Sequence, residues 1–151
     1  FRRAGVVYQN PNCQLFMPTV AQEVAFAAKS EDFAREIMEL FGIAHLAERH
    51  PQSLSEGQKR RVSIAAVAAS QPELLLLDEP TVGQDGEGLR TLLHALNLLH
   101  TRTGSTIVTV THDRRCTSAL CDRAAWLREG RIEKTGGPEL IEAAWRDLAA
   151  L

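Results

Sequence analysis

The 151-residue sequence predicts an α/β fold in which helices flank a largely parallel sheet. Two observations lead to this class. Short apolar runs with the length and composition of buried strands occur at residues 5–8, 74–77 and 105–113. Longer segments with apolar residues at helical spacing lie between them. Strands and helices that alternate in this way form parallel sheets, because each crossover returns the chain to the same end of the sheet.

The first strand is expected at "GVVY", residues 5–8, and a loop with two prolines follows at 9–18. Thr19 and Gln22 have the spacing of a capping box, in which side chains at the helix start satisfy free backbone N–H groups. This spacing predicts a helix over residues 20–29.

Two further helices are expected before the middle of the chain. Residues 32–41 place their apolar side chains on one helical face, and Gly42 is suited to end that helix. A short helix is expected to end near His50–Pro51, because the residue before a proline disfavours helical geometry.

The stretch "SLSEGQKRRVSIA", residues 53–65, begins the next predicted helix in an unusual way. Ser55 fits the N-cap and Gln58 stands where a capping box requires it, so a helix is expected over 55–70. Gly57 in the first turn does not favour a helix. We therefore expect Gly57 to keep side-chain bulk away from exposed backbone N–H groups, which form an anion site together with the helix dipole.

The second half of the chain alternates in the same manner. The uninterrupted apolar run at 74–77 is typical of a strand covered on both faces, and residues 87–102 form an amphipathic helical pattern. The remaining expected elements are a buried, β-branched strand at 105–113, a helix ending near Cys121, a hairpin over 124–134 turning at Glu129–Gly130, and an amphipathic helix at 138–151.

Composition narrows the function classes. The net charge is −2 and the basic residues are scattered, so the sequence shows no nucleic-acid footprint. The longest apolar runs, such as "IAAVAA" from Ile64, fall far short of a membrane span. Three cysteines, an odd number, argue against a disulfide framework and for a reducing compartment.

Polar residues cluster where the predicted strands end. Gln9, the pair Asp78–Glu79 and the run 111–113 follow the three strands, and ligands of open α/β sheets bind outside the carboxyl ends of strands. Taken singly, a strand-end Asp is often a helix cap and a lone His is often solvated. Together with an anion-binding helix start, the three clusters predict a phosphate and metal site, in which Asp78 suits Mg²⁺ and Glu79 suits activation of a water.

These residues resemble the ordered motifs of ABC-type ATPases. "LSEGQ" at 54–58 resembles the signature motif, with Glu56 in place of the commonest Gly, and "LLLLDEP" at 74–80 resembles the Walker B strand. The other matches are Gln9 for the Q-loop, "VGQD" at 82–85 for the D-loop and "TVTHD" at 109–113 for the H-loop. The resemblance runs from Val6 to about Gly136 in the family's order.

The stretch over 9–26 is similar to the ATPase subunits of energy-coupling-factor importers, which take up vitamins, cobalt or nickel. The resemblance implies a P-loop NTPase-like ABC ATPase domain, with a helical signature subdomain at about 19–70, core elements at about 71–137 and a C-terminal helix at 138–151. It implies a peripheral protein at the cytoplasmic face of the cell membrane. Its expected partners are a second ATPase subunit, identical or not, and the transmembrane subunits of an importer, with no nucleic acid.

The resemblance also implies roles for single residues, with ATP and Mg²⁺ as cofactors. Ser55, Gly57 and Gln58 are expected to bind the γ-phosphate of an ATP that is held mainly by the partner subunit. Asp85 reaches across the dimer. The other expected roles concern the metal and the reaction. Asp78 is the Mg²⁺ ligand and Glu79 the general base, while Gln9 senses Mg²⁺ and the γ-phosphate and His112 contacts the γ-phosphate.

Some features of the family pattern are missing. No Gly–Lys pair occurs in the sequence, so it has no Walker A loop, and the aromatic residue that stacks on adenine is absent too. Gln84 stands where the D-loop usually has Leu, and Gly86 stands where Pro is common. We therefore expect this chain to be the C-terminal portion of an importer ATPase whose N-terminal part is missing.

Three alternatives remain open from the residues. The chain could be a truncated, non-catalytic half-site or interaction module, or a soluble ABC ATPase of DNA repair or translation. A metal site built from His112, Cys116 and Cys121 is the third, although the spacing of the two cysteines does not place them on one helical face.

Overall fold

The computed structural model describes residues 3–137, 139–140, 142–143 and 146. By its internal contacts the chain divides into two units, residues 1–110 and 111–151, and each is described by itself. The amphipathic helix expected at 138–151 falls largely outside the described residues.

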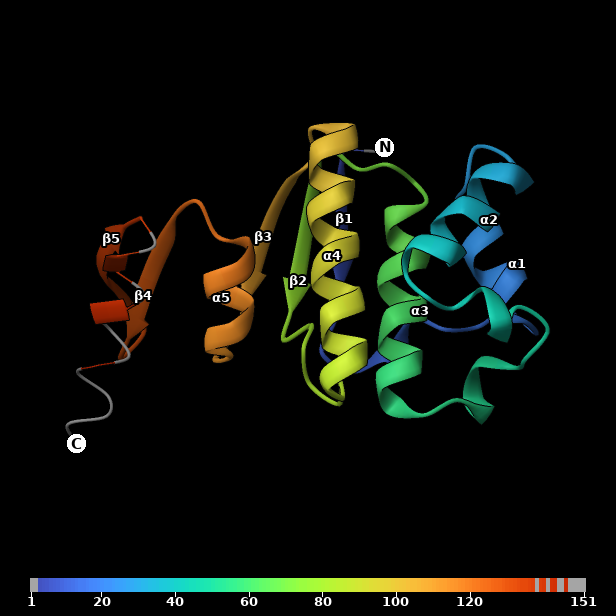
Figure 1. Ribbon diagram of the computed structural model, residues 1–151, viewed down its shortest axis with the longest axis horizontal. Helices are drawn as coiled ribbons and strands as arrows, with labels where there is room; N and C mark the ends of the chain where they lie inside the picture. Colours follow the sequence, from blue (N-terminus) through green and yellow to red (C-terminus); the bar gives the residue numbers. More distant parts are fainter. Residues whose placement is uncertain (1–2, 138, 141, 144–145, 147–151) are drawn as a thin grey trace. The chain divides into compact units, whose positions relative to one another are not determined.

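The first unit is built on a three-stranded parallel sheet (Figure 1). Its strands are β1 (Ala4–Val7), β2 (Leu74–Asp78) and β3 (Thr106–Val110), in the order β1-β2-β3. Val7 pairs with Leu77, and Asp78 pairs with Val110. The prediction of a parallel sheet is therefore confirmed, and the carboxyl ends of the strands meet at one edge.

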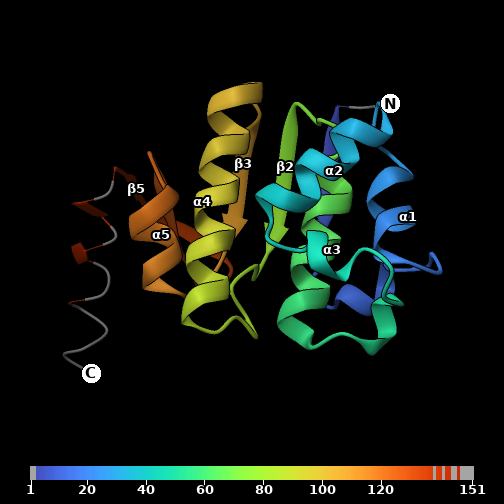
Figure 2. The ribbon, with the colours of Figure 1, turned by 45° about the vertical axis from the view of Figure 1, so that its right-hand side comes forward.

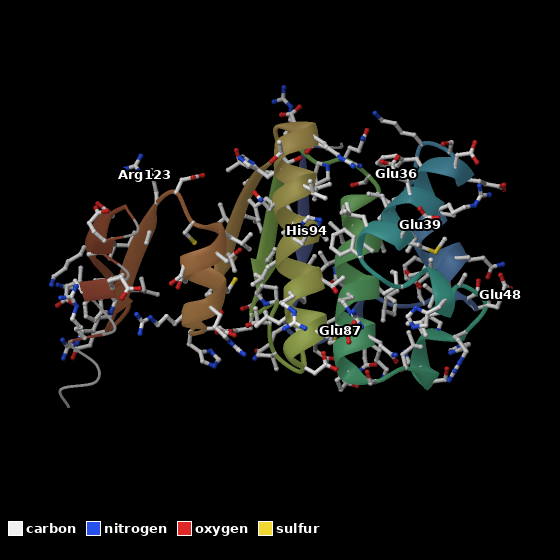
Figure 3. The ribbon with its side chains drawn as sticks, in the orientation of Figure 1. Glu36, Glu39, Glu48, Glu87, His94 and Arg123 are labelled. Carbon is white, nitrogen blue, oxygen red and sulfur yellow. The ribbon has the colours of Figure 1, made fainter. Side chains whose placement is uncertain are left out.

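Four helices accompany the sheet. They are α1 (Val20–Ala25), α2 (Glu31–Leu40), α3 (Glu56–Ala68) and α4 (Gly86–Thr103), together with the 3₁₀ turns η1 (Pro11–Cys13), η2 (Ala44–Leu46) and η3 (Pro51–Ser53). Figures 1 and 2 show α3 and α4 side by side along the sheet, with α1 and α2 packed on α3. At the surface, Glu36 of α2 (labelled in Figure 3) forms an ion pair with Arg102 of α4, with 2.7 Å between the charged atoms.

Each of these helices begins at a polar side chain that accepts a hydrogen bond from the backbone. Thr19, Ser30, Ser55 and Asp85 are the N-caps of α1 to α4, which satisfies N–H groups that a helix start leaves free. Gly42, with φ of +65°, follows α2 in the left-handed region, as predicted for a residue that ends a helix.

Within the described residues of the first unit, helices cover only one face of the sheet. Val7, Leu75 and Leu77 point toward the helices and are at most 2% exposed. On the opposite face Val108 is 45% exposed, and Leu76 is only half-buried. The prediction that residues 74–77 form a strand covered on both faces is wrong for this structure, and so is the prediction that the third strand is buried. The reason is that one layer of helices packs on the sheet and that β3, among the described strands, pairs with β2 alone.

Two helices are shorter than their sequence pattern predicts. α1 ends at Ala25 instead of near Lys29, because the N–H of Ala28 bonds to the Ala25 carbonyl in a tight turn and Ser30 must be extended to cap α2. The short helix expected before Pro51 is the single 3₁₀ turn η2.

The second unit contains α5 (Arg114–Leu120) and a hairpin of β4 (Ala124–Arg128) and β5 (Arg131–Gly136). Glu129 and Gly130 both have positive φ, 49° and 75°, as a tight hairpin turn requires. The predicted turn at these two residues is confirmed.

The core of the first unit is apolar and lies between the helices and the covered face of the sheet. Its largest fully buried side chains include Phe41, Ile43, Ile64, Leu92 and Leu96. In the part of the chain that the structure describes, every helix is too short or too polar to cross a bilayer.

Candidate functional site

Two of the predicted polar clusters lie together at the carboxyl edge of the sheet. Gln9 comes two residues after β1, while Asp78 ends β2 and Glu79 follows it. Gln9 and Asp78 are exposed and Glu79 is half-buried. The N–H of Glu79 donates to the Val110 carbonyl at 2.9 Å, which fixes the end of β2 against the end of β3.

Arg60 joins the ends of β1 and β2. Its guanidinium donates to the main-chain carbonyls of Gln9 and of Asp78, the latter at 3.5 Å, and the residue is 5% exposed. Burial lowers the pKa of Arg60, and the nearby carboxylates of Glu56, Asp78 and Glu79 offset part of this shift. An arginine stays protonated at neutral pH even so, which places a buried positive charge beneath the carboxylates.

The backbone of Glu79 is strained. Its φ is +47°, in the left-handed region that residues other than glycine rarely enter, at a cost of about 1–2 kcal/mol. Such residues persist only where the surroundings impose the conformation, and they concentrate at functional sites. This strain could not be predicted from the sequence, because Glu is not a residue type that favours positive φ.

The capping box predicted at the start of α3 is confirmed. The N–H of Gln58 donates to Ser55 Oγ at 3.3 Å, and the Gln58 side chain accepts from the N–H of Ser55 at 3.0 Å. Both side chains are therefore engaged in ordering the helix start, while Ser55 remains exposed.

Gly57 has a packing role that the sequence did not indicate. It is buried, and a Cβ built on it would lie 2.4 Å from the carbonyl oxygen of Gly83. The first turn of α3 packs directly against the loop before α4 at this glycine. The expectation that Gly57 keeps side-chain bulk away from exposed N–H groups of the helix start stays a prediction. Binding of a phosphate by this helix start stays a prediction.

Lys59 is a second buried cation that the sequence analysis did not single out. It is 8% exposed, and its Nζ donates to Asn12 Oδ1 at 3.1 Å and to Glu56 Oε1 at 3.0 Å. Lys59 and Arg60 thus attach α3 to the loop after β1. The signal was available, because three adjacent cations, residues 59–61, precede the apolar and small second half of the helix, and such cations are candidates for buried partners.

Asp85 is the N-cap of α4, and its Oδ1 accepts from the N–H of Gly88 at 2.6 Å. Asp85 therefore caps the helix that follows the loop after β2. Its predicted reach across a dimer stays a prediction.

His112 belongs to the second unit, and its predicted contact with the γ-phosphate stays a prediction. It is exposed and precedes Asp113, the N-cap of α5, whose carboxylate pairs with Arg115 with 2.8 Å between the charged atoms.

The residues at the carboxyl edge fit Mg²⁺ with a phosphate better than a closed metal site. Among the described residues, no group of three His, Cys, Asp or Glu side chains is arranged to hold a metal ion, which also leaves the alternative His–Cys site without support. Mg²⁺ is usually bound through one or two carboxylates, with water and phosphate oxygens completing the shell. Asp78, exposed at the end of β2, is suited to that single-carboxylate role.

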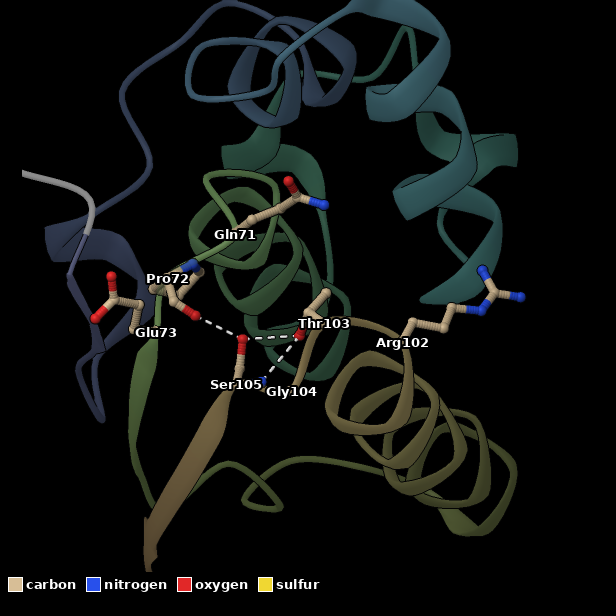
Figure 4. Close-up of a pocket in the computed structure, with 7 residues that line it drawn as sticks. All are labelled: Gln71, Pro72, Glu73, Arg102, Thr103, Gly104 and Ser105. Atoms are coloured by element: carbon tan, nitrogen blue, oxygen red, sulfur yellow. Dashed lines mark hydrogen bonds between the residues drawn. The ribbon is translucent and has the colours of Figure 1, made fainter.

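A separate pocket lies at the amino ends of β2 and β3 (Figure 4). Its polar atoms largely bond to one another: Ser105 Oγ donates to the Pro72 carbonyl at 2.5 Å and lies 2.8 Å from Thr103 Oγ1. Ligands of parallel sheets bind at the opposite ends of the strands, so this pocket is not the candidate site.

The fold is that of an α/β protein with a parallel sheet, and its candidate ligand site lies at the carboxyl edge of that sheet, where the strand-end carboxylates lie. The chain matches the family described as "ABC transporter" over residues 2–82, more than half of its length. The chain therefore belongs to the ABC transporter family.

Two relatives of the chain are ATP-binding proteins of energy-coupling factor transporters. The chain is 36% identical over 159 residues to the energy-coupling factor transporter ATP-binding protein EcfA2 of Bacillus licheniformis, a match that covers 99% of the chain and 55% of the relative. It is 40% identical over 151 residues to EcfA2 of Latilactobacillus sakei, with 94% and 52% covered. The chain spans about half the length of these curated relatives.

Solved structures agree with the fold. The structure of CbiO1 from Clostridium perfringens, described as part of the ABC transporter complex CbiONQ, matches with a TM-score of 0.79 and 34% identity over 99% of the chain and 62% of CbiO1. The ATP-binding cassette MJ0796, solved as a dimer bound to ADP and Pi, matches with a TM-score of 0.77 and 27% identity over 90% of the chain and 63% of that cassette. The predicted ABC ATPase fold is thereby confirmed.

Proposed function

We propose that this chain supplies the signature face and the catalytic carboxylates of an ATP-hydrolysing subunit that energises an importer of the energy-coupling-factor type. The observation that carries the proposal is the joint placement of Gln9, Asp78 and Glu79 at one sheet edge, with Arg60 of α3 bonded to two of their carbonyls. The similarity to two EcfA2 proteins and to CbiO1 supports the importer type over a soluble ABC ATPase.

In this proposal each residue has a defined task. Asp78 would hold Mg²⁺, which when bound neutralises charge on the transferred phosphate. Glu79, next along the chain, accepts a proton from the attacking water, and its imposed backbone conformation fixes where its carboxylate starts. Gln9 lies at the same edge and responds to the bound state of the site.

A second group of residues faces the nucleotide of the partner subunit in this proposal: Ser55, Gly57, Gln58 and Asp85. The start of α3 provides the positive end of a 13-residue helix dipole, which favours a phosphate. Two such chains, identical or not, are then needed for complete sites, and the dimer of the related cassette MJ0796 bound to ADP and Pi supports this arrangement.

The membrane partner is proposed to bind beside the loop after Gln9. Phe16 and Phe26 are 65% and 67% exposed and contact each other edge to face, with 5.3 Å between ring centres. They line a groove with Leu15 and Val67 in its wall. An apolar helix of a transmembrane subunit fits such a groove, because aromatic anchors dominate binding at interfaces. The protein would then sit as a peripheral subunit at the cytoplasmic face of the membrane.

The absence of a Gly–Lys pair favours a second candidate, a half-site without activity of its own. The 151-residue chain alone is expected to bind MgATP weakly or not at all, because a phosphate cradle of the Walker A type is absent from its sequence. Isothermal titration at millimolar MgATP tests this. Stoichiometric binding would mean that the chain holds a nucleotide without a partner.

Two matched serine variants test the composite site in the full-length gene product. Ser55 and Ser30 are both N-caps with the same local bond, but only Ser55 lies at the start of the signature helix. Ser55→Arg should abolish MgATP-dependent dimerisation and hydrolysis, whereas Ser30→Arg should cost stability and leave both activities. Equal loss in the two variants, or survival of activity in Ser55→Arg, would contradict the proposed function.

A further inference from the structure

The side chain of Gln84 lies between the first turn of α3 and the first turn of α4. These two helix starts carry the residues proposed to face the partner subunit. Gln84 Nε2 donates to the carbonyl oxygen of Gly57 in the first turn of α3 at 2.8 Å. Its Oε1 lies beside the first turn of α4, only 2.7 Å from where a Cβ on Gly88 would stand. The side chain is half-buried between these two turns.

The main chains beneath this bridge are unusually close. Gly57 and Gly83 allow the approach, since a Cβ on Gly57 would lie 2.4 Å from the Gly83 carbonyl, and Gly83 has a φ of +78° that suits glycine. A Cβ on Gly83 would in turn lie 3.5 Å from the N of Gly57. The glycines make the contact possible, and the Gln84 bond is the directional interaction that sets its register.

The residue at position 84 differs from the usual residue of the resembling motif. Gln84 stands where the resembling motif usually has Leu, which has a similar length and no donor. A leucine could fill the space between the two turns, but it could not bond to the Gly57 carbonyl. The two turns are therefore joined here by a hydrogen bond that the usual residue cannot make.

We propose that Gln84 is a positioning residue, which holds Ser55 at the start of α3 and Asp85 at the start of α4 at one spacing before any nucleotide arrives. Ser55 and Asp85 are each the N-cap of their helix, so a link between the two first turns fixes both side chains together. A surface that is already assembled binds its ligand at a lower entropic cost. This inference rests on the proposed function, in which both residues face the nucleotide of the partner.

The first experiment tests the link in the 151-residue chain without nucleotide. The amide groups of Val82 and Gln84 donate within the loop, to Glu79 and Thr81, and report its opening by hydrogen exchange. Loss of one hydrogen bond corresponds to about fivefold lower protection in Gln84→Leu. Gln84→Glu should show the same loss at pH 7 and regain protection near pH 4, where its protonated carboxyl can donate; Gln84→Leu should show no such recovery.

This pH comparison separates bonding from space filling, because all three side chains have similar lengths. The proposed link would be overturned if hydrogen-exchange protection in Gln84→Leu stayed within twofold of the wild type. It would also be overturned if Gln84→Glu regained no protection at low pH relative to Gln84→Leu.

The second experiment tests positioning in the full-length gene product. Gln84→Leu should raise the MgATP concentration for half-maximal dimerisation severalfold and leave the nucleotide affinity of the monomer unchanged. Lower hydrogen-exchange protection with unchanged dimerisation would overturn the positioning role. A wild-type protein that does not dimerise with MgATP would instead defeat the proposed function, and the exchange data would still report on the link.

Discussion

The buried guanidinium of Arg60 donates a hydrogen bond to the main-chain carbonyl of Asp78, and a second one to that of Gln9. One side chain of α3 thus determines how the ends of β1 and β2 meet. Because both carbonyls belong to proposed site residues, the stability of the fold and the geometry of the site depend on the same bonds.

Arg60→Met should therefore lower the free energy of unfolding of the chain by about 1.5–3 kcal/mol, since hydrogen bonds to a charged group are lost while the volume is kept. Urea unfolding measures this. Arg90→Met on the exposed surface of α4 is the control, with an expected change within about 0.5 kcal/mol. Equal effects of the two variants would show that the Arg60 bonds contribute nothing specific.

Gly57→Ala should lower the free energy of unfolding, whereas Gly86→Ala should leave it unchanged or raise it. The added methyl group at 57 meets the Gly83 carbonyl at 2.4 Å, so the loop must shift at a cost of about 1–3 kcal/mol. At Gly86, in the first turn of α4, nothing lies within 4 Å, and alanine should be neutral or stabilise by up to about 1 kcal/mol. Thermal unfolding of the two variants distinguishes them, and a stabilised Gly57→Ala would refute the close contact.

Phe16→Ala should leave the stability of the chain nearly unchanged, with a loss below about 1 kcal/mol, because its ring is already 65% exposed. Phe41→Ala is the matched core variant, with an expected loss of about 3–5 kcal/mol. In the full-length gene product, Phe16→Ala should keep basal ATP hydrolysis and lower transport. A strongly destabilised Phe16→Ala would end the proposal that the groove binds a membrane partner.

The three cysteines should react with alkylating reagents at different rates. Burial, with a smaller contribution from Asp122, raises the pKa of the Cys121 thiol, and thiolate is the reactive form. Cys13 is exposed and should be modified first, Cys121 more slowly, and the buried Cys116 only on unfolding. Mass spectrometry of a labelling time course at pH 8 gives the order.

The raised pKa of Cys121 also sets a sign for the dependence of stability on pH. The neutral thiol is favoured in the folded chain, so its contribution is complete below the unfolded thiol pKa, about 8.5, and is lost as pH rises through the higher folded value. Cys121→Ser should reduce the loss of stability between pH 8 and 10. An unchanged slope would show that another group causes it.

The sequence was informative where local rules decide the structure. The capping box of Ser55 and Gln58, the left-handed Gly42 and the turn at Glu129–Gly130 are confirmed, because each depends on a few neighbouring residues. The ordered motifs also predicted the family. These features need no knowledge of distant contacts.

The features that the sequence did not predict depend on contacts between residues that are distant in sequence. Covering of the strand at 74–77 depends on which layers pack on the sheet, and the burial of Gly57 depends on Gly83, 26 positions further along. Arg60 and Lys59 bond to residues 9–12 and 78, which their charge alone does not reveal. The strain at Glu79 follows from the junction of β2 and β3 and has no signature in the residue type.

The most direct test of the account is the rate of ATP hydrolysis by the full-length gene product with Glu79→Gln. Loss of a general base costs on the order of 10²–10⁴-fold in rate, while the amide keeps the size of the side chain. Glu87→Gln, an exposed change in the first turn of α4 (labelled in Figure 3), is the control and should keep normal turnover. The account predicts a collapse of turnover in Glu79→Gln with an ATP-bound dimer accumulating; turnover within a few-fold of the wild type would contradict it.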